Sequence, residues 1–206
     1  MRGDELKKTW MEEHVSDQFV KRAEKDGWRS RAAYKLIEIQ EDEKFLKPGM
    51  AVVDLGAAPG SWSQVVSEIV GDTGKVFALD LLEISPIPRV EIIRGDFTAE
   101  EVLIELEKML NGSQVDLVIS DMAPNISGIK AVDQAKWLGL AELAFDFCYE
   151  NLKRNGSLLV KCFEGSGSQG FRESLREAFN SVKVKKPAAS RDRSSEFFLF
   201  AKGKKG

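Results

Sequence analysis

The chain has 206 residues, which is enough for one α/β domain with a sizeable core and short for two. Its single histidine, His14, nearly excludes histidine-based triads and His-rich metal sites; Cys148 and Cys162 lack metal-ligand spacing, so we expect reduced, buried thiols and no metal. No stretch approaches the ~20 apolar residues of a membrane span, and no signal-peptide core follows Met1, which favours a cytoplasmic protein without a membrane partner.

The net charge of −3 conceals an uneven distribution along the chain. Residues 36–150 carry 8 Lys and Arg against 21 Asp and Glu, whereas residues 1–35 carry 9 against 7 and residues 151–206 carry 13 against 5. Basic ends that flank an acidic middle are typical of a protein that binds a polyanion on one face. Solvated lysines on a C-terminal helix and strand edge are the alternative, and charge alone does not separate the two.

The chain begins with a polar segment before its first regular pattern. Residues 1–29 indicate a basic and polar N-terminal extension with one short helix, and residues 30–206 form the main domain. Ser30 can cap a helix that runs to about Phe45. The helix should stop at Lys47, which is followed by Pro and Gly.

Strand and helix patterns then alternate. Strands are expected at Ala51–Leu55, Lys75–Leu79, Val90–Ile93, Val115–Ser120 and Ser157–Cys162, and helices at Ser61–Val70, Ala99–Leu110, Val132–Leu152 and Gln169–Ala178. Continuous apolar strands indicate a parallel sheet covered by helices on both faces. Two final runs, Val182–Lys185 and Glu196–Ala201, should form an antiparallel hairpin at one edge. The prediction is a doubly wound α/β fold with a seven-stranded, mostly parallel sheet and one antiparallel edge strand.

The loop after the first strand is the most informative motif. It reads Asp54-Leu55-Gly56-Ala57-Ala58-Pro59-Gly60 and joins an apolar strand to a helix, as in sheets that bind an adenine-containing cofactor. Gly56 and Gly60 let the backbone approach a ligand because they lack a Cβ. The loop has neither the G-x-x-x-x-G-K-S/T pattern of a nucleotide-phosphate loop nor the G-x-G-x-x-G pattern of a dinucleotide-binding loop. We therefore interpret it as a binding loop for S-adenosylmethionine. An ordinary strand-to-helix turn is the alternative.

Carboxylates end the next three strands, where ligands of open α/β sheets lie. Asp80 can accept hydrogen bonds from the ribose hydroxyls of the cofactor, and Asp96 can take the adenine amino group. Asp121 ends the fourth strand. Each could instead cap a helix, above all Asp96. A nicotinamide dehydrogenase would share the Asp80 argument but should show a third glycine in its loop.

A lysine at the end of the fifth strand is the candidate reaction centre. Lys161 is costly to bury in its charged form, which favours a role as a base toward a hydroxyl, with Asp121 to orient it. A lysine that extends to solvent is the alternative. Strand alternation puts Cys162 on the opposite face, which disfavours a cysteine mechanism. The segment after Asp121 also lacks the D/N-P-P-Y pattern that amino-group methyltransferases often show after the fourth strand. Methylation of a base nitrogen is therefore disfavoured but not excluded.

Five motifs stand out when the chain is considered as a whole. They are Ser30-Arg31-Ala32-Ala33-Tyr34-Lys35-Leu36, Asp54-Leu55-Gly56-Ala57-Ala58-Pro59-Gly60-Ser61-Trp62, Ser120-Asp121-Met122-Ala123-Pro124-Asn125, Leu159-Val160-Lys161-Cys162-Phe163 and Ser190-Arg191-Asp192-Arg193-Ser194-Ser195-Glu196. Together they resemble the FtsJ family of RNA 2′-O-ribose methyltransferases. The resemblance covers about Ser30 to Lys202 and implies a Rossmann-like, S-adenosylmethionine-dependent methyltransferase fold.

The resemblance also implies residue roles and a reaction. The family's catalytic set falls on Lys35, Asp121, Lys161 and Glu196, and its cofactor contacts fall on Gly60, Trp62, Asp80, Asp96 and Asp121. The implied reaction is 2′-O-methylation of a uridine in large-subunit ribosomal RNA, with S-adenosylhomocysteine as product, by a monomer that acts on the ribosomal subunit. Transfer RNA or an mRNA cap as substrate, and a non-catalytic ribosome-binding module, are the alternatives.

We expect the RNA to contact the basic ends of the chain. The expected contacts are Lys21, Arg22, Arg29, Arg31, Arg191 and Arg193. Phosphate contacts of this kind position the RNA without selecting its sequence.

Overall fold

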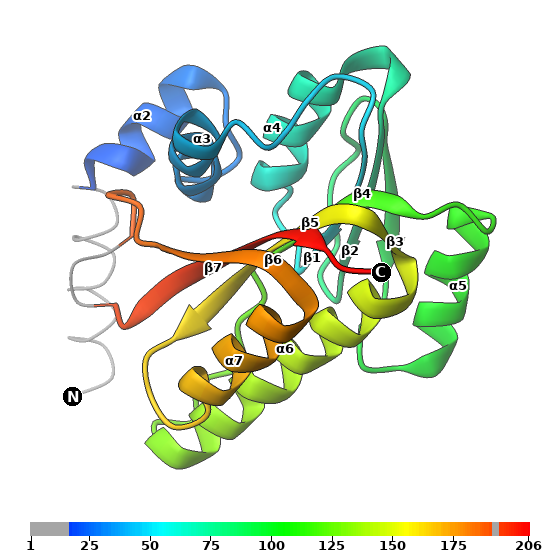
Figure 1. Ribbon diagram of the computed structural model, residues 1–206. Helices are drawn as coiled ribbons and strands as arrows, with labels where there is room; N and C mark the ends of the chain where they lie inside the picture. The colour runs from blue at the N-terminus through cyan, green and yellow to red at the C-terminus, as the bar shows by residue number, and fades with distance from the viewer. Residues whose placement is uncertain (1–16, 191–193) are drawn as a thin grey trace.

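The computed structural model describes residues 17–190 and 194–206. The helices are α2 (Gln18–Asp26), α3 (Ala32–Glu43), α4 (Ser61–Val70), the short 3-10 helix η1 (Gly71–Thr73), α5 (Glu100–Leu110), α6 (Lys130–Asn151) and α7 (Ser168–Ala178). The strands are β1 (Ala51–Leu55), β2 (Lys75–Asp80), β3 (Val90–Arg94), β4 (Val115–Ser120), β5 (Leu152–Phe163), β6 (Phe179–Lys185) and β7 (Glu196–Lys204). Helices lie on both faces of one sheet (Figure 1).

The sheet confirms the expected α/β architecture and corrects the position of its antiparallel strand. The strand order is β3-β2-β1-β4-β5-β7-β6, and the pairs among β1 to β5 are parallel. The antiparallel strand is β7, which pairs with both β5 and β6 and therefore lies one position inside the edge. Residues 196–201 are all buried, whereas β6 is mostly exposed. Burial on both faces puts β7 inside the sheet, and the polar strand takes the edge.

Two apolar layers cover the two faces of the sheet. One contains Leu106 of α5, Trp137 of α6 and Leu175 of α7. The other contains Leu36 of α3 and Val66 of α4, together with Phe198 of β7. Successive strand residues alternate between these layers, so each strand end directs neighbouring side chains to opposite sides.

The expected short helix near the N-terminus is α2. Asp17 caps it by accepting a hydrogen bond from the Phe19 amide at 2.9 Å, and Gly27 ends it with a φ of 80°. Trp28 then packs against the apolar layer of α3 and α4. The described part of the expected extension, residues 17–29, thus contacts the main domain directly. None of the helices within the described ranges is long and apolar enough to cross a membrane.

Candidate active site

A cavity of about 790 Å³ lies at the carboxyl ends of the parallel strands. Its walls include Gly56 and Ala58 after β1, Asp80 at the end of β2, and Asp96 beyond β3. Other wall residues are Leu81, Leu82, Gly95, Phe97, Thr98, Asp121, Met122, Ala123, Pro124, Asn125, Ala135, Lys136, Gly139, Leu140 and Leu143. The expected strand-end carboxylates therefore meet at one hollow, as parallel strands require.

The glycines of the loop after β1 are required by geometry. Gly56 has a φ of 75°, and a Cβ there would lie 2.5 Å from Cγ of Met122 across the cavity wall. Gly60 has a φ of 102° and is not a wall residue; its Cβ would meet Ile87 and Arg29 instead. Gly56 thus lets the loop after β1 pack closely against Met122, which also lines the cavity. Gly60 allows close packing behind the loop.

Asp80 joins the two loops that border the cavity. Its Oδ2 accepts a hydrogen bond from the Ala58 amide at 2.9 Å, and its Oδ1 accepts one from the Leu82 amide at 2.8 Å. Asp96 lines the cavity and also accepts hydrogen bonds from the amide and hydroxyl of Thr98 at 2.9 and 2.8 Å. These bonds hold the pKa of Asp96 below its ordinary value. Asp96 therefore closes a local turn ahead of α5 but does not cap the helix, because the N-cap position is Ala99, which has no side-chain cap hydrogen bond.

Asp54 is a buried carboxylate whose role the motif did not reveal. It is 1% exposed, and its Oδ2 accepts a hydrogen bond from the hydroxyl of Ser63 at 2.6 Å. Its Oδ1 has no hydrogen-bond partner among the described residues. Burial, with smaller contributions from Asp121 and Asp80, raises the pKa of Asp54 to about 7. An acidic residue within an otherwise apolar strand was the available signal.

The four residues of the expected catalytic set come together from four segments. Lys161 on β5 forms an ion pair with Asp121 after β4 at 3.0 Å, and it also donates to the Asp121 backbone carbonyl. Lys35 on α3 forms an ion pair with Glu196 on β7 at 2.6 Å. Burial alone would raise the pKa of Glu196, but Lys35, with smaller effects of Ser190 and then Lys161, outweighs it and holds the pKa below its ordinary value. The two pairs therefore form one electrostatically coupled group.

The β5 strand separates Lys161 from Cys162. The Lys161 side chain is 8% exposed and paired, so it does not extend to solvent. Cys162 is fully buried in the layer of α6 and α7, and this burial raises its pKa. Cys148 is buried in the same layer, and both thiols are free, which confirms the sequence prediction. Cys162 cannot act as a nucleophile at the cavity from this position.

Trp62 supports the site from behind. It is 2% exposed, its indole N–H donates to the Ala32 carbonyl at 2.8 Å, and its ring packs 5.5 Å from that of Phe198. Its side chain is therefore part of the apolar layer under the loop and not of the cavity wall.

The expected RNA contacts separate into different environments. Lys21 and Arg22 are exposed on α2, and the Arg22 guanidinium lies 4.5 Å from the ring centre of Tyr34. Arg31 is engaged by Asp17 and by the Ala189 carbonyl. Arg29 is held by backbone carbonyls, as described below. Arg191 and Arg193 lie outside the described residues.

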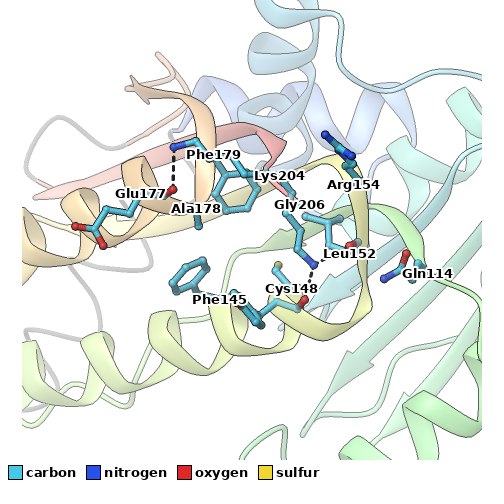
Figure 2. A pocket seen from close by; sticks show the side chains of 12 residues that line it. Gln114, Phe145, Cys148, Leu152, Arg154, Glu177, Ala178, Phe179, Lys204 and Gly206 are labelled. Atoms are coloured by element: carbon cyan, nitrogen blue, oxygen red, sulfur yellow. Dashed lines mark hydrogen bonds between the residues drawn. The ribbon is translucent and has the colours of Figure 1, made fainter.

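A second cavity, of about 480 Å³, lies where α6 and α7 end (Figure 2). Lys204 donates to the carbonyls of Tyr149 and Leu152, and Lys205 donates to those of Arg176 and Glu177. Both ammonium groups therefore satisfy helix C-termini.

The comparisons with known proteins agree with this geometry. A model of the FtsJ-like methyltransferase family matches residues 28–204. The chain belongs to this family. The matched span contains the whole cavity and all four residues of the coupled group.

The relatives of this FtsJ-like methyltransferase match over nearly their whole length. The chain is 54% identical to the Ribosomal RNA large subunit methyltransferase E of Chromobacterium violaceum, over 95% of this chain and 96% of that one. It is 58% identical to the protein of the same name from Methylobacillus flagellatus, over 93% of each. A solved Plasmodium falciparum structure, described as a candidate ribosomal RNA methyltransferase, has a TM-score of 0.77 at 30% identity and covers 87% of this chain and 100% of its own.

Proposed function

We propose that this chain transfers the methyl group of S-adenosylmethionine to the 2′-hydroxyl of a uridine in large-subunit ribosomal RNA, leaving S-adenosylhomocysteine. The observation that carries the proposal is the Lys161–Asp121 pair, because Asp121 belongs both to that pair and to the cavity wall. The RNA class follows the names of relatives that are 54% and 58% identical over more than nine-tenths of the chain.

The cavity has the features that the cofactor requires. Gly56 and Met122 pack closely in its wall, where a Cβ on Gly56 would collide with Met122. In this proposal the wall residues Asp80 and Asp96 accept from the ribose hydroxyls and the adenine amino group, and the exposed Leu82 offers an apolar contact for the base. When bound, the cofactor supplies a methyl group already activated by its sulfonium, so the protein's task is alignment and proton removal.

Lys161 performs the proton step in this proposal. Its Nζ acts as a neutral amine that takes the proton of the ribose hydroxyl and becomes an ammonium, and Asp121 holds its position and pairs with the ammonium that results. Glu196 balances the charge of Lys35 beside it, and Lys35 steadies the target nucleotide or its phosphate. Holding the hydroxyl in line with the methyl group contributes several kcal/mol, up to ~7–11 in favourable intramolecular cases.

The test is the Lys161→Ala variant. We expect it to bind S-adenosylhomocysteine with unchanged affinity by calorimetry, because Lys161 is not a wall residue of the cavity. We expect transfer of labelled methyl groups to large-subunit RNA to fall by about 100-fold or more, the usual scale for a general base. The control is Lys75→Ala, which removes an exposed lysine at the start of β2.

Mapping of the methylated positions then distinguishes the alternatives. The proposal requires a new 2′-O-methyluridine in large-subunit RNA. Methylation of transfer RNA or capped mRNA instead would identify a different substrate. Cofactor binding without any transfer would indicate a binding module. Near-normal turnover by Lys161→Ala would remove Lys161 from the mechanism.

A further inference from the structure

Arg29 lies in the segment between α2 and α3, and its guanidinium donates hydrogen bonds to three backbone carbonyls of other loops. Its Nη1 donates to the carbonyls of Pro59 at 2.9 Å and Ser85 at 2.7 Å, and its Nη2 donates to that of Pro86 at 2.8 Å. We call this arrangement the Arg29 bridge. Neutral carbonyls that accept from a guanidinium form charge-assisted hydrogen bonds, which are stronger than ordinary amide bonds.

The bridge connects the two loops that border the cofactor cavity. Pro59 belongs to the loop after β1, which contributes Gly56 and Ala58 to the cavity wall. Ser85 and Pro86 belong to the loop after β2, which contributes wall residues at 81 and 82. Asp80 links the same two loops from the cavity side through the amides of residues 58 and 82. Two independent charged groups thus fix one pair of loops.

The surroundings of Arg29 are shaped to hold the guanidinium. A Cβ on Gly60 would lie 2.9 Å from Nη1, so only glycine leaves room there. The Arg29 amide donates to Oε1 of Gln64 on α4 at 3.0 Å, which fixes the backbone at this point. The preceding residue, Trp28, packs into the apolar layer. Both the backbone and the side chain of Arg29 are therefore held against the cofactor loop.

We propose that Arg29 is a positioning residue of the cofactor site and not primarily an RNA contact. It acts through the loops of Pro59 and Ser85, whose spacing sets the width of the cofactor cavity. The proposal rests on the cofactor assignment made above, and it revises the expectation from sequence that Arg29 binds phosphate. It also makes the segment before residue 30 a functional part of the methyltransferase domain.

The arrangement requires an arginine because the carbonyls of Pro59, Ser85 and Pro86 accept from two different nitrogen atoms of the guanidinium. Three of its N–H groups serve the three carbonyls from two nitrogen atoms. Lysine has the same charge but a single nitrogen, so it cannot span both loops in this geometry. A phosphate contact would tolerate lysine far better, since it depends mainly on charge. The Arg29→Lys variant therefore separates the two roles.

The experiment compares Arg29→Lys and Arg29→Gln with Arg22→Gln, which alters an exposed arginine of α2. Calorimetry measures the affinity for S-adenosylhomocysteine, and filter binding measures the affinity for large-subunit RNA. Hydrogen exchange without ligand measures opening of the two loops at their hydrogen-bonded amides, which are those of Ala57, Ala58 and Gly60 in the first loop and those of Leu82 and Val90 at the ends of the second. We expect both Arg29 variants to weaken the binding of S-adenosylhomocysteine about tenfold and to speed hydrogen exchange in both loops. RNA affinity should stay within twofold for Arg29→Lys, whereas Arg22→Gln should weaken RNA binding only.

Unchanged loop exchange and product affinity in folded Arg29→Lys would overturn the proposal, as would a loss of RNA affinity alone. Thermal unfolding identifies variants that fail to fold. If Arg29→Gln does not fold, the comparison of Arg29→Lys with the wild type is sufficient for the test. Failure of the proposed function would give a different result: the wild-type protein would bind S-adenosylhomocysteine but methylate no RNA. The exchange measurement needs neither RNA nor turnover, so the two failures remain distinguishable.

Discussion

Asp54 shows at the scale of one residue how burial changes an acid. Its side chain is buried in β1, accepts one hydrogen bond from Ser63, and has a pKa of about 7 against 3.8 for the ordinary group. Between these two values the folded state holds a proton that the unfolded chain has lost. The free energy of unfolding therefore falls as the pH rises through this window.

The Asp54→Asn variant tests this dependence. An amide oxygen can still accept from Ser63, and the side chain no longer titrates. We expect the wild type to lose stability relative to the variant between pH 4.5 and 8, by about 3 kcal/mol, since one pKa unit corresponds to about 1.4 kcal/mol and most of the loss falls below pH 7. Urea unfolding of the cofactor-free protein at several pH values measures the difference. Parallel curves for the two proteins would contradict the assigned pKa.

The positions of candidate site residues were predictable where a motif gave both the residue type and its place in the fold. Asp80, Asp96, Asp121 and Lys161 lie at strand ends, and the position of a strand end can be derived from the pattern alone. Roles that depend on side-chain direction were not. Trp62 adjoins the loop in sequence but turns into the apolar layer, because its large apolar surface is better buried than exposed.

At the scale of elements, the edge strand β6 is tied to α3 by charge. Glu43, the last residue of α3, has a side chain only 7% exposed and pairs with Lys183 at 2.9 Å and with Lys185. Burial alone would raise the pKa of Glu43, but the two lysines outweigh it and lower that pKa. The mostly exposed β6 has few apolar contacts of its own, so this pairing contributes to holding the edge in place.

The Glu43→Gln variant should destabilise the fold. It leaves Lys185, 16% exposed, with only the exposed Asp42 as an ion-pair partner. We expect a loss of about 1–3 kcal/mol at pH 7, between the values typical of exposed and buried pairs. Urea unfolding measures it, and Glu41→Gln on the exposed side of α3 should change stability by less than about 0.5 kcal/mol. Equal effects of the two changes would show that the pairing contributes nothing specific.

At the scale of the whole molecule, segments from opposite ends of the described chain meet in the catalytic group. Lys35 comes from the N-terminal part of the chain and Glu196 from its C-terminal part, and they meet at 2.6 Å. Lys21 and Arg22 lie exposed on the adjoining α2. In the proposed function, we expect an RNA backbone to contact this positive charge while its target ribose enters the site.

Salt dependence tests this surface. We expect the RNA dissociation constant to rise steeply with salt, and the double variant Lys21→Ala/Arg22→Ala to reduce the slope of log Kd against log salt by up to about 2. The control Lys75→Ala/Lys108→Ala removes the same charge from exposed sites on β2 and α5. The two slopes, measured by filter binding from 50 to 200 mM salt, should differ. A flat response of the wild type, or equal slopes for both double variants, would exclude α2 as a phosphate contact.

The sequence by itself determined the order of strands and helices, the glycine loop and the strand-end acids, because these depend on local pattern and on the rule that ligands bind beyond parallel strand ends. The tertiary structure decided that β7 lies inside the sheet and that Lys35 and Glu196 pair. It also decided that Arg29 turns toward the carbonyls of Pro59 and Ser85. Those outcomes depend on contacts between distant segments, where burial and hydrogen bonding, and not local pattern, select one arrangement.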